Sequence, residues 1–299
     1  MSDKESNNEI QIISERLQTV ATLEYNNTQQ QQGKSARKNN NSVDIKTISD
    51  NATITTTENI FVRNVPELNL PEKILLVIDT VKEQQCTPFK LGTGATYSPL
   101  FMIKRVVENF VCAKSTIQPG VHQYALMSLE AMDTCWLCDY TSNIKTVFNY
   151  LEGIEENTLD EEQKTYDLGN LFETIHGRIA IPSKHQPAFV SRVILIYGRS
   201  SSVPKFYTRQ KYLENLTENP YFFLDVLFVH EPPGDDDICE KVYAEIAALD
   251  TMGFSYIFEV GRNAAKIHDN MAKLLAHPLQ RPLQKDASYT YTPLDVKHS

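Results

Sequence analysis

The sequence has 299 residues, of which 41% are hydrophobic and 22% are charged, and its formal net charge is −9. A chain of this length and composition is expected to be globular, with one large domain or two small ones. An acidic chain without a basic run lacks the Lys and Arg contacts that phosphate groups need, which argues against binding to nucleic acid or to an anionic membrane.

The N-terminus and the apolar stretches predict neither a secretory signal nor a membrane span. The first ten residues have no basic region leading into an apolar core, and the longest apolar candidate, residues 221–230, is far shorter than the ~20 residues of a span. Five cysteines without a framework spacing are typical of free thiols in a reducing compartment. We therefore expect a location in the cytoplasm, the nucleus or both.

Residues 1–60 are predicted to be a disordered polar tail. They are rich in Asn, Gln, Ser and Thr, with polar runs at 29–32 and 39–41. Such a segment cannot bury enough apolar surface to offset the entropy of ordering it. The tail is nearly neutral, so most of the negative charge belongs to the rest of the chain. We expect a domain over residues 66–276 and an extended tail over 277–299.

The first half of this domain begins with a buried strand. Residues 74–79 form a continuous apolar run closed by Asp79, as expected of a parallel strand covered on both faces. Ser98 and Pro99 then open a helix as N-cap and first helical residue. Residues 123–129 and 134–137 are predicted to pair as a hairpin at the sheet edge. The helix and the next one carry apolar residues at helical spacing: Leu100, Ile103, Val107, Phe110 and Val111, then Ile144, Val147, Phe148 and Leu151.

The second half continues the alternation of helices and strands. An acidic loop is expected over 154–163, and Asp167 can cap a helix with apolar residues Leu168, Leu171, Phe172, Ile175 and Ile179. Residues 193–197, 222–229 and 255–260 are predicted strands. The acidic run 235–237 lies before a helix, where the helix dipole favours negative charge; that helix carries Ile238, Val242, Ile246 and Leu249. A last helix covers 264–275.

Strands that alternate with helices predict an α/β fold, a doubly wound and mostly parallel sheet with helices on both faces. Ligands of such sheets bind at the carboxyl ends of the strands, so Asp79 marks the first place to look for a site. No dinucleotide motif follows it, and Gly92 and Gly94 read as a flexible loop. The sequence has no phosphate-binding loop, H-E-x-x-H, His-x-His or G-x-S-x-G motif. It therefore indicates a protein that is not an enzyme and that has no cofactor.

Cys135 and Cys138 have the spacing of a zinc-binding or redox pair. On a strand, however, positions three apart point to opposite faces, so the two sulfurs would neither bond nor bind one metal ion. A second C-x-x-C that would complete a zinc site is missing. We expect both to be buried core thiols.

The order of elements and the Asp that closes the first strand resemble the von Willebrand factor A-like family. In that family a metal-ion-dependent adhesion site uses Asp-x-Ser-x-Ser, a Thr and a second Asp. Here Val81 and Glu83 stand at the two serine positions, and Arg199 lies where the last Asp is expected. Magnesium requires nearly complete octahedral oxygen ligation. The resemblance therefore implies a degenerate adhesion site around Asp79 that holds no metal.

The C-terminal part resembles one branch of this family, the scaffold subunits of the BRISC and BRCA-A deubiquitinase complexes. The similar segments are 270–282 with 287–289, and less specifically 220–225, 249–251 and 255–256. The resemblance covers roughly 65–285. It implies a non-catalytic scaffold that directly binds a subunit built from ubiquitin-conjugating-enzyme-variant domains. A JAMM-type deubiquitinase and its pseudo-enzyme scaffold would belong to the same complex, which cleaves lysine-sixty-three-linked ubiquitin chains.

Residues 277–293 are the predicted docking peptide for that partner. Pro278 and Pro282 favour an extended polyproline-II shape, which loses little entropy on docking. An arginine offers a planar fork to a carboxylate or to carbonyls, and a leucine supplies an apolar contact. The predicted partner-binding residues are His277, Pro278, Leu279, Gln280, Arg281, Pro282 and Tyr289, with Tyr291 as a further contact.

Three alternatives stay open at this point. A metal-dependent A-domain module unrelated to ubiquitin would bind magnesium and lose it on Asp79→Ala. An enzyme on a doubly wound fold would need a catalytic constellation that the sequence does not display. A binding domain for an unrelated assembly would share the fold alone. The acidic loops at 154–163 and 231–237 are expected to face water.

Overall fold

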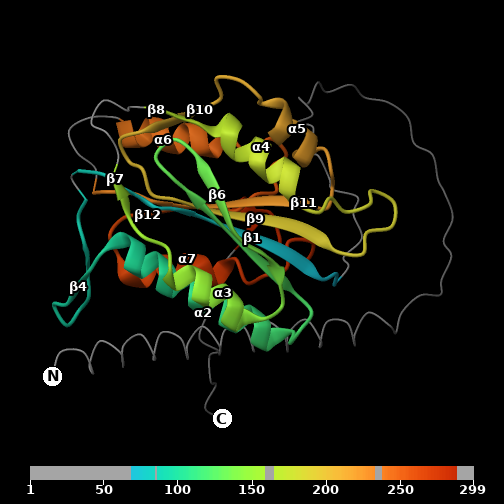
Figure 1. Ribbon diagram of the computed structural model, residues 1–299, viewed down its shortest axis with the longest axis horizontal. Helices are drawn as coiled ribbons and strands as arrows, with labels where there is room; N and C mark the ends of the chain where they lie inside the picture. The colour runs from blue at the N-terminus through green and yellow to red at the C-terminus, as the bar shows by residue number, and fades with distance from the viewer. Residues whose placement is uncertain (1–68, 85, 159–164, 233–237, 288–299) are drawn as a thin grey trace, which may run out of the picture.

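A computed structural model describes residues 69–84, 86–158, 165–232 and 238–287 (Figure 1). The predicted polar tail, the acidic run at 235–237 and the predicted contact residues Tyr289 and Tyr291 lie outside these ranges. None of the described helices is both long and apolar enough to cross a bilayer.

A six-stranded sheet runs through the middle of the molecule (Figure 1). Neighbouring strands are parallel except for the last pair, which is antiparallel. The doubly wound, mostly parallel sheet predicted from the sequence is therefore confirmed, as is the hairpin at its edge. The strands in spatial order are β12 (Ile257–Val260), β11 (Phe222–Val229), β9 (Val190–Tyr197), β1 (Glu72–Asp79), β5 (Gln123–Leu129) and β6 (Thr134–Thr141).

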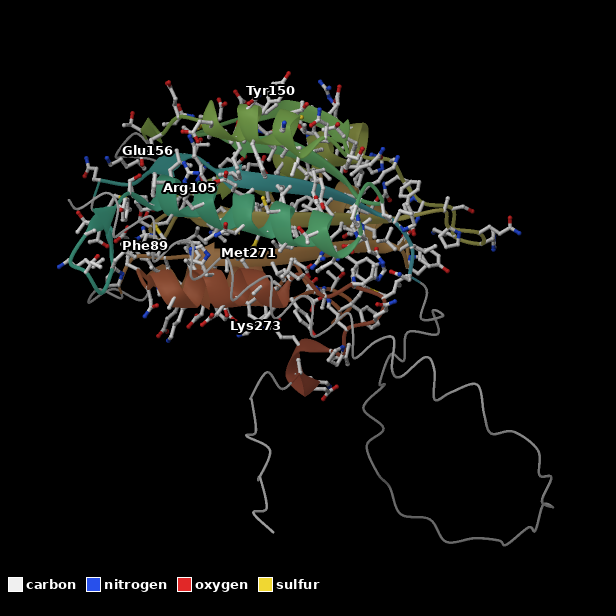
Figure 2. All side chains as sticks on the ribbon, turned by 90° about the horizontal axis from the view of Figure 1, so that it is seen from below. Phe89, Arg105, Tyr150, Glu156, Met271 and Lys273 are labelled. Carbon is white, nitrogen blue, oxygen red and sulfur yellow. The ribbon has the colours of Figure 1, made fainter. Side chains whose placement is uncertain are left out.

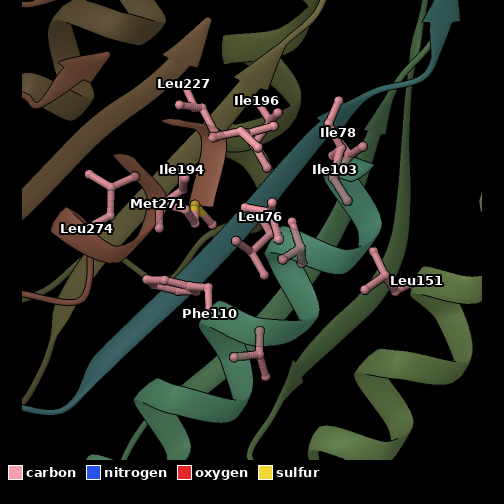
Figure 3. Packing of buried hydrophobic residues seen from close by; sticks show 14 of the residues in the cluster. Leu76, Ile78, Ile103, Phe110, Leu151, Ile194, Ile196, Leu227, Met271 and Leu274 are labelled. Atoms are coloured by element: carbon pink, nitrogen blue, oxygen red, sulfur yellow. The ribbon is translucent and has the colours of Figure 1, made fainter. Parts of the chain in front are cut away.

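Helices cover both faces of the sheet because each central strand is apolar on both sides. Along β1, Ile74, Leu76 and Ile78 belong to one core cluster, while Leu75 and Val77 belong to the other. The first cluster lies under α2 (Pro99–Ile117), α3 (Ile144–Glu152) and α7 (Ala264–Lys273), and Figure 3 shows its packing. The second lies under α4 (Leu168–Arg178), α5 (Lys211–Thr217) and α6 (Ile238–Ala247) (Figure 1).

The outer surface of the first helical layer is polar, with few exceptions. Figure 2 shows this layer from outside, with Met271 between α2 and α7 and with Tyr150 at the upper edge. Met271 is 2% exposed, whereas Tyr150 is 50% exposed. The helices thus have the amphipathic faces that their sequence periodicity predicts.

Two predicted helix caps are present. The Ser98 hydroxyl accepts a hydrogen bond from the amide of Phe101 at 3.3 Å, with Pro99 at the first helical position. The Asp167 carboxylate accepts one from the amide of Gly169 at 2.8 Å. These side chains satisfy amide groups that the first helical turn leaves without partners.

Several short elements carry too few residues for a sequence pattern to reveal them. The predicted loop around Gly92 and Gly94 is a turn between two of them, β3 (Phe89–Lys90) and β4 (Thr96–Tyr97). The predicted strand 255–260 begins only at Ile257, because the amides of Phe254 and Ser255 donate to the Asp250 carboxylate instead. The short elements are β2 (Val81–Lys82), β3 (Phe89–Lys90), β4 (Thr96–Tyr97), β7 (Asn157–Thr158), β8 (Thr165–Asp167), β10 (Val203–Lys205) and the 3-10 turn η1 (Gln284–Asp286).

The two cysteines of β6 differ in exposure. Cys138 is 4% exposed and packs in the first core cluster, whereas Cys135 is exposed; both are free. The prediction that both are core thiols was therefore wrong for Cys135. The two residues were also expected to point to opposite faces, but the register shift beside Leu126 puts both on one face, with Cys135 opposite Ser128 and Cys138 opposite Leu126. Cys135 is exposed because it lies at the start of the edge strand, away from the core residues that cover Cys138.

Candidate functional site

At the carboxyl end of β1, the Asp79 carboxylate is paired with an arginine. The Nε of Arg199 lies 3.1 Å from both carboxylate oxygens of Asp79. The same carboxylate accepts hydrogen bonds from the amides of Gly198 (3.0 Å) and Val81 (3.2 Å). Asp79 is 4% exposed, so its oxygens are engaged by protein donors in a buried site.

The rest of the Arg199 guanidinium contacts the loop after β5 and a tyrosine of β8. It donates to the carbonyl oxygens of Ala131, at 3.2 Å, and Glu130 in the loop after β5. Its face lies over the Tyr166 ring at 4.3 Å. Burial opposes the charged form, but Asp79 raises the pKa of Arg199 overall, so the guanidinium stays charged. The positive charge at this position is therefore supplied by the chain itself.

The residues around Asp79 do not fit a magnesium ion. Glu83 stands at a position where the adhesion motif has a hydroxyl, and its carboxylate accepts the amides of Ser200 and Ser201, each at 2.8 Å, and the Ser201 hydroxyl at 2.6 Å. Within the described part, no group of three or more His, Cys, Asp or Glu side chains could hold a metal ion. A cation here would have to displace the Arg199 guanidinium from a buried carboxylate.

At the opposite end of the sheet, the C-terminal segment is folded onto the domain. The amides of Gln280 and Arg281 both donate to the His277 carbonyl, at 2.9 and 3.0 Å, which makes residues 277–281 a turn. The predicted extended polyproline-II shape was therefore wrong for this part. The fixed φ of Pro278 suits a turn as well as an extended chain, and the turn is needed for Arg281 to reach the sheet.

Arg281 is the anchor of this segment. Its guanidinium forms a two-point ion pair with Asp225 in the middle of β11, with one contact at 2.9 Å. It also donates to the Phe254 carbonyl at 3.1 Å and lies 3.9 Å from the centre of the Tyr256 ring. The side chain of Arg281 is only 2% exposed. Burial alone would raise the pKa of Asp225, but Arg281 and Arg192 lower it overall.

This ion pair belongs to a buried charge cluster, defined here as Glu72, Lys114, Arg192, Asp225 and Arg281. Arg192 bridges Glu72 (3.0 Å) and Asp225 (2.8 Å), and Lys114 lies 2.5 Å from Glu72. Burial would raise the pKa of Glu72, but Lys114 and Arg192 lower it overall. All five side chains are nearly or fully buried, so the ion pairs are shielded from water.

The cluster also binds the chain that leaves α7. Lys114 donates to the Leu275 carbonyl at 2.8 Å, and Arg192 donates to the Ala276 carbonyl at 3.4 Å. Carbonyls at a helix C-terminus carry partial negative charge and favour nearby cations. The buried charge cluster therefore holds both the end of α7 and, through Arg281, the turn that follows.

His277 fixes the start of the turn. Its Nε2 lies 2.9 Å from the Leu70 carbonyl, and its Nδ1 accepts the Leu279 amide at 3.2 Å, which together require the neutral ring. Burial lowers the pKa of His277 to about 4, and the same cause lowers that of His122, which accepts the Glu72 amide at 3.0 Å, to about 4.

The structure divides the predicted partner-binding residues into two groups. His277, Pro278 and the Arg281 side chain are buried against the chain's own domain. Leu279 and Gln280 are half-buried and Pro282 is exposed, so these can reach a partner.

Leu279 and Pro282 are both fixed by contacts with the domain. Leu279 packs on a small apolar cluster of Val190, Tyr221 and Phe223. The Pro282 carbonyl accepts the Tyr256 hydroxyl at 2.7 Å. Both residues are thus presented on a fixed backbone.

The sequence prediction missed the charged residues beneath the segment. Arg192 and Asp225 each stand within an apolar run that was predicted, correctly, as a buried strand or its immediate flank. A charge inside a fully buried strand has to be paired, and this is the signal that could have identified both residues.

Comparisons with known proteins give close relatives in sequence. No protein-family model matches the chain. It is 32% identical to "BRISC and BRCA1-A complex member 1" of Xenopus laevis over 77% of this chain and 70% of that one. The Homo sapiens protein of the same name is also 32% identical, over 75% of this chain and 69% of that one. For the Danio rerio protein the identity is 32%, and the chain spans 62% of that relative's length.

Solved structures with a similar fold include von Willebrand factor A domains. The SpRpn10 VWA domain is 12% identical with a TM-score of 0.42, covering 67% of this chain and 93% of that one. The von Willebrand factor type A protein from Catenulispora acidiphila is 11% identical with a TM-score of 0.42, covering 70% and 43%.

Proposed function

The chain belongs to the BRISC and BRCA1-A complex member 1 family, and we propose that it is a non-catalytic scaffold subunit that maintains the assembly of a deubiquitinase complex. The complex is BRISC or its nuclear BRCA-A counterpart, cleaves lysine-sixty-three-linked ubiquitin chains, and works in the cytoplasm and the nucleus. The direct partner is the subunit built from ubiquitin-conjugating-enzyme-variant domains. A JAMM-type deubiquitinase and its pseudo-enzyme scaffold belong to the same assembly.

The observation that carries this proposal is the folded segment at residues 277–283, which consists of the turn 277–281 and the two residues after it and is called the C-terminal turn from here on. Arg281 anchors the turn to Asp225, and the turn presents Leu279, Gln280 and Pro282 at the surface. A partner that binds residues already fixed in place loses less entropy on binding than one that binds a free tail. The turn therefore supplies the kind of preformed contact surface that a permanent subunit uses.

The state of Asp79 and Glu83 supports a non-catalytic role. Both carboxylates lie at the carboxyl ends of the strands, where a doubly wound fold binds its ligands. Each is fully engaged by protein donors, Asp79 by Arg199 and Glu83 by the amides of Ser200 and Ser201. A carboxylate in this state is a structural acceptor and is not free to act as a base or a metal ligand.

Co-purification from cells tests the proposal. The tagged full chain is expected to bring down a JAMM-type deubiquitinase together with the subunit built from ubiquitin-conjugating-enzyme-variant domains, called the variant-domain subunit from here on. Leu279→Asp introduces a charge into the half-buried contact position and should lose both proteins. Met132→Asp is the matched control, since Met132 is 62% exposed and follows β5 at the opposite end of the sheet.

Two results would contradict the proposal. If the unmodified chain brings down no deubiquitinase, the scaffold function is wrong. If Leu279→Asp retains the same partners as Met132→Asp, the assembly is real but the turn is not its docking surface.

A further inference from the structure

The two edge strands of the main sheet, β12 and β6, differ in whether side chains bond to their outer backbone groups. At the β12 edge, the Gln284 side chain pairs with Ile257 as another strand would. Its Oε1 accepts the Ile257 amide at 2.6 Å, and its Nε2 donates to the Ile257 carbonyl at 2.8 Å. The Asn270 amide donates to the Glu259 carbonyl at 3.4 Å. Proteins commonly protect edge strands in such ways, because unpaired backbone groups invite pairing with another chain.

Within residues 69–287, apart from the gaps named above, no side chain covers the β6 edge in a comparable way. β6 (Thr134–Thr141) is eight residues long and is the last strand of the sheet order. Among the residues that the structure describes, one side chain bonds to its backbone, the Cys138 thiol, which lies 3.4 Å from the Asp139 carbonyl. A thiol is a weak donor. The outer side of β6 therefore presents backbone donors and acceptors to whatever lies beside it.

Aromatic rings and cations follow this open edge. Trp136 and Tyr140 of β6 pack edge to face with their ring centres 6.1 Å apart. The Arg178 guanidinium lies 5.8 Å from the Trp136 ring, and the Lys73 ammonium lies 5.9 Å from the Tyr140 ring and 4.4 Å from that of Phe189. We call these five residues the edge strip.

The two cations of the edge strip lack carboxylate partners. No salt bridge joins Lys73 or Arg178 to an acidic residue within the described part of the chain. The nearest β6 carboxylate, Asp139, accepts the Trp136 indole N–H at 2.8 Å. Both cations are therefore available to pair with acidic side chains of a segment that lies along the β6 edge.

We propose that the β6 edge binds an extended, acidic segment of another protein by β-augmentation. The backbone of the segment pairs with β6, and its acidic side chains lie against Lys73 and Arg178. Because Trp136 and Tyr140 lie on the same sheet face as both cations, the alternate, apolar side chains of the segment lie on the opposite face, beside Leu137. Backbone pairing supplies affinity in this binding mode, while side-chain contacts supply specificity. Tyr, Trp and Arg are also the residues that most often dominate the energy of protein interfaces.

The geometry of β6 sets the length of that segment. The register between β5 and β6 shifts on both sides of Leu126, between Tyr124 and Leu126 and between Leu126 and Met127. Such irregularities bend and twist a strand and limit continuous pairing. The bound segment is therefore short, and this surface is separate from the C-terminal turn and does not depend on the scaffold function.

A synthetic peptide tests the proposal with the isolated full chain. The probe is Glu-Val-Glu-Phe-Glu-Val-Glu with blocked ends, and its counterpart has Lys at every Glu position. Trp136 is the single tryptophan of the chain, so indole fluorescence reports binding directly. The acidic peptide should change the emission saturably, bind more weakly at high salt, and slow hydrogen exchange in 134–141. The basic peptide should do none of these.

Charge reversal gives the matched comparison. Lys73→Glu with Arg178→Glu should weaken the acidic peptide at least tenfold and allow the basic peptide to bind. Lys241→Glu with Lys266→Glu changes the net charge equally at exposed sites on α6 and α7 and should leave binding unchanged. Urea midpoints of all variants establish that they are folded.

Three outcomes would overturn the proposal: no saturable binding of the acidic peptide, equal binding of both peptides, or equal loss in both double variants. Concentration-dependent dimers in sedimentation that protect 134–141 would also overturn it, because a second copy of the chain would then occupy the edge.

Discussion

Replacing Arg281 with Met should detach the C-terminal turn while keeping the apolar stem of the side chain. The change removes a two-point ion pair with Asp225 and a hydrogen bond to the Phe254 carbonyl, all in a site where Arg281 is 2% exposed. Removing one partner of a buried ion pair typically costs roughly 3–5 kcal/mol. Asp225 keeps Arg192 at 2.8 Å and the Tyr256 amide at 2.8 Å, so we expect a loss of about 3 kcal/mol.

Urea unfolding of the full chain measures this loss by linear extrapolation. Lys285→Met, at an exposed position of the same segment, is the control and should change the free energy of unfolding by less than about 0.5 kcal/mol. Hydrogen exchange should show faster exchange in 277–287 for Arg281→Met alone.

A double-mutant cycle isolates the ion pair from other effects of the substitution. Arg281→Met, Asp225→Asn and the double variant should give a coupling energy of at least about 1.5 kcal/mol, within the range for residues in direct contact. A coupling energy below about 0.5 kcal/mol would refute the reasoning, because Arg281 would then be held by something other than Asp225.

Three further predictions concern other parts of the fold. The pKa of His277 is lowered from 6.5 to about 4 in the folded chain, so its contribution to stability is present above pH 6.5 and is lost as the pH falls toward 4. Between pH 7.5 and 5, the free energy of unfolding should therefore fall by roughly 2 kcal/mol less in His277→Gln than in the unmodified chain; an equal fall in both would contradict this. Arg199→Met leaves Asp79 buried without its cation and should lower the free energy of unfolding by roughly 3–5 kcal/mol. Millimolar magnesium should not shift the melting temperature of the unmodified chain, because Arg199 occupies the site. A clear rise in the melting temperature with magnesium would contradict this. In Gly169→Ala the new Cβ would lie 2.5 Å from the Thr208 carbonyl oxygen. The melting temperature should therefore fall, with a loss of about 1–3 kcal/mol in the free energy of unfolding. An unchanged melting temperature would show that the loop around Thr208 can move away.

Most of the main sheet follows from the sequence because its strands are buried on both faces. A run such as 74–78 is apolar throughout, which favours a place at the centre of a parallel sheet. Ser98 and Asp167 marked helix starts because a cap needs a short polar side chain at one defined position. The two-residue strands β2, β3, β4 and β7 are too short to show a periodicity, and their pairing forms only in the folded chain.

The conformation of the candidate docking segment could not be predicted from the sequence. Proline and arginine in 277–282 pointed to a recognition segment, yet their order along the chain cannot say whether Arg281 faces outward or inward. The Arg281 side chain points inward because it pairs with Asp225, which lies 56 residues earlier in the chain. Asp225 is buried, so its charge has to be paired with a cation. At Asp79, by contrast, the arginine was expected near the carboxylate, because both lie at the carboxyl ends of adjacent strands.

The affinity of the purified full chain for the variant-domain subunit tests the central claim most directly. Isothermal titration should give at least tenfold weaker binding for Leu279→Asp, equivalent to about 1.4 kcal/mol, and unchanged binding for Met132→Asp. Equal affinities for the two variants, with both shown to be folded, would contradict the account and remove the turn at 277–283 as the docking surface.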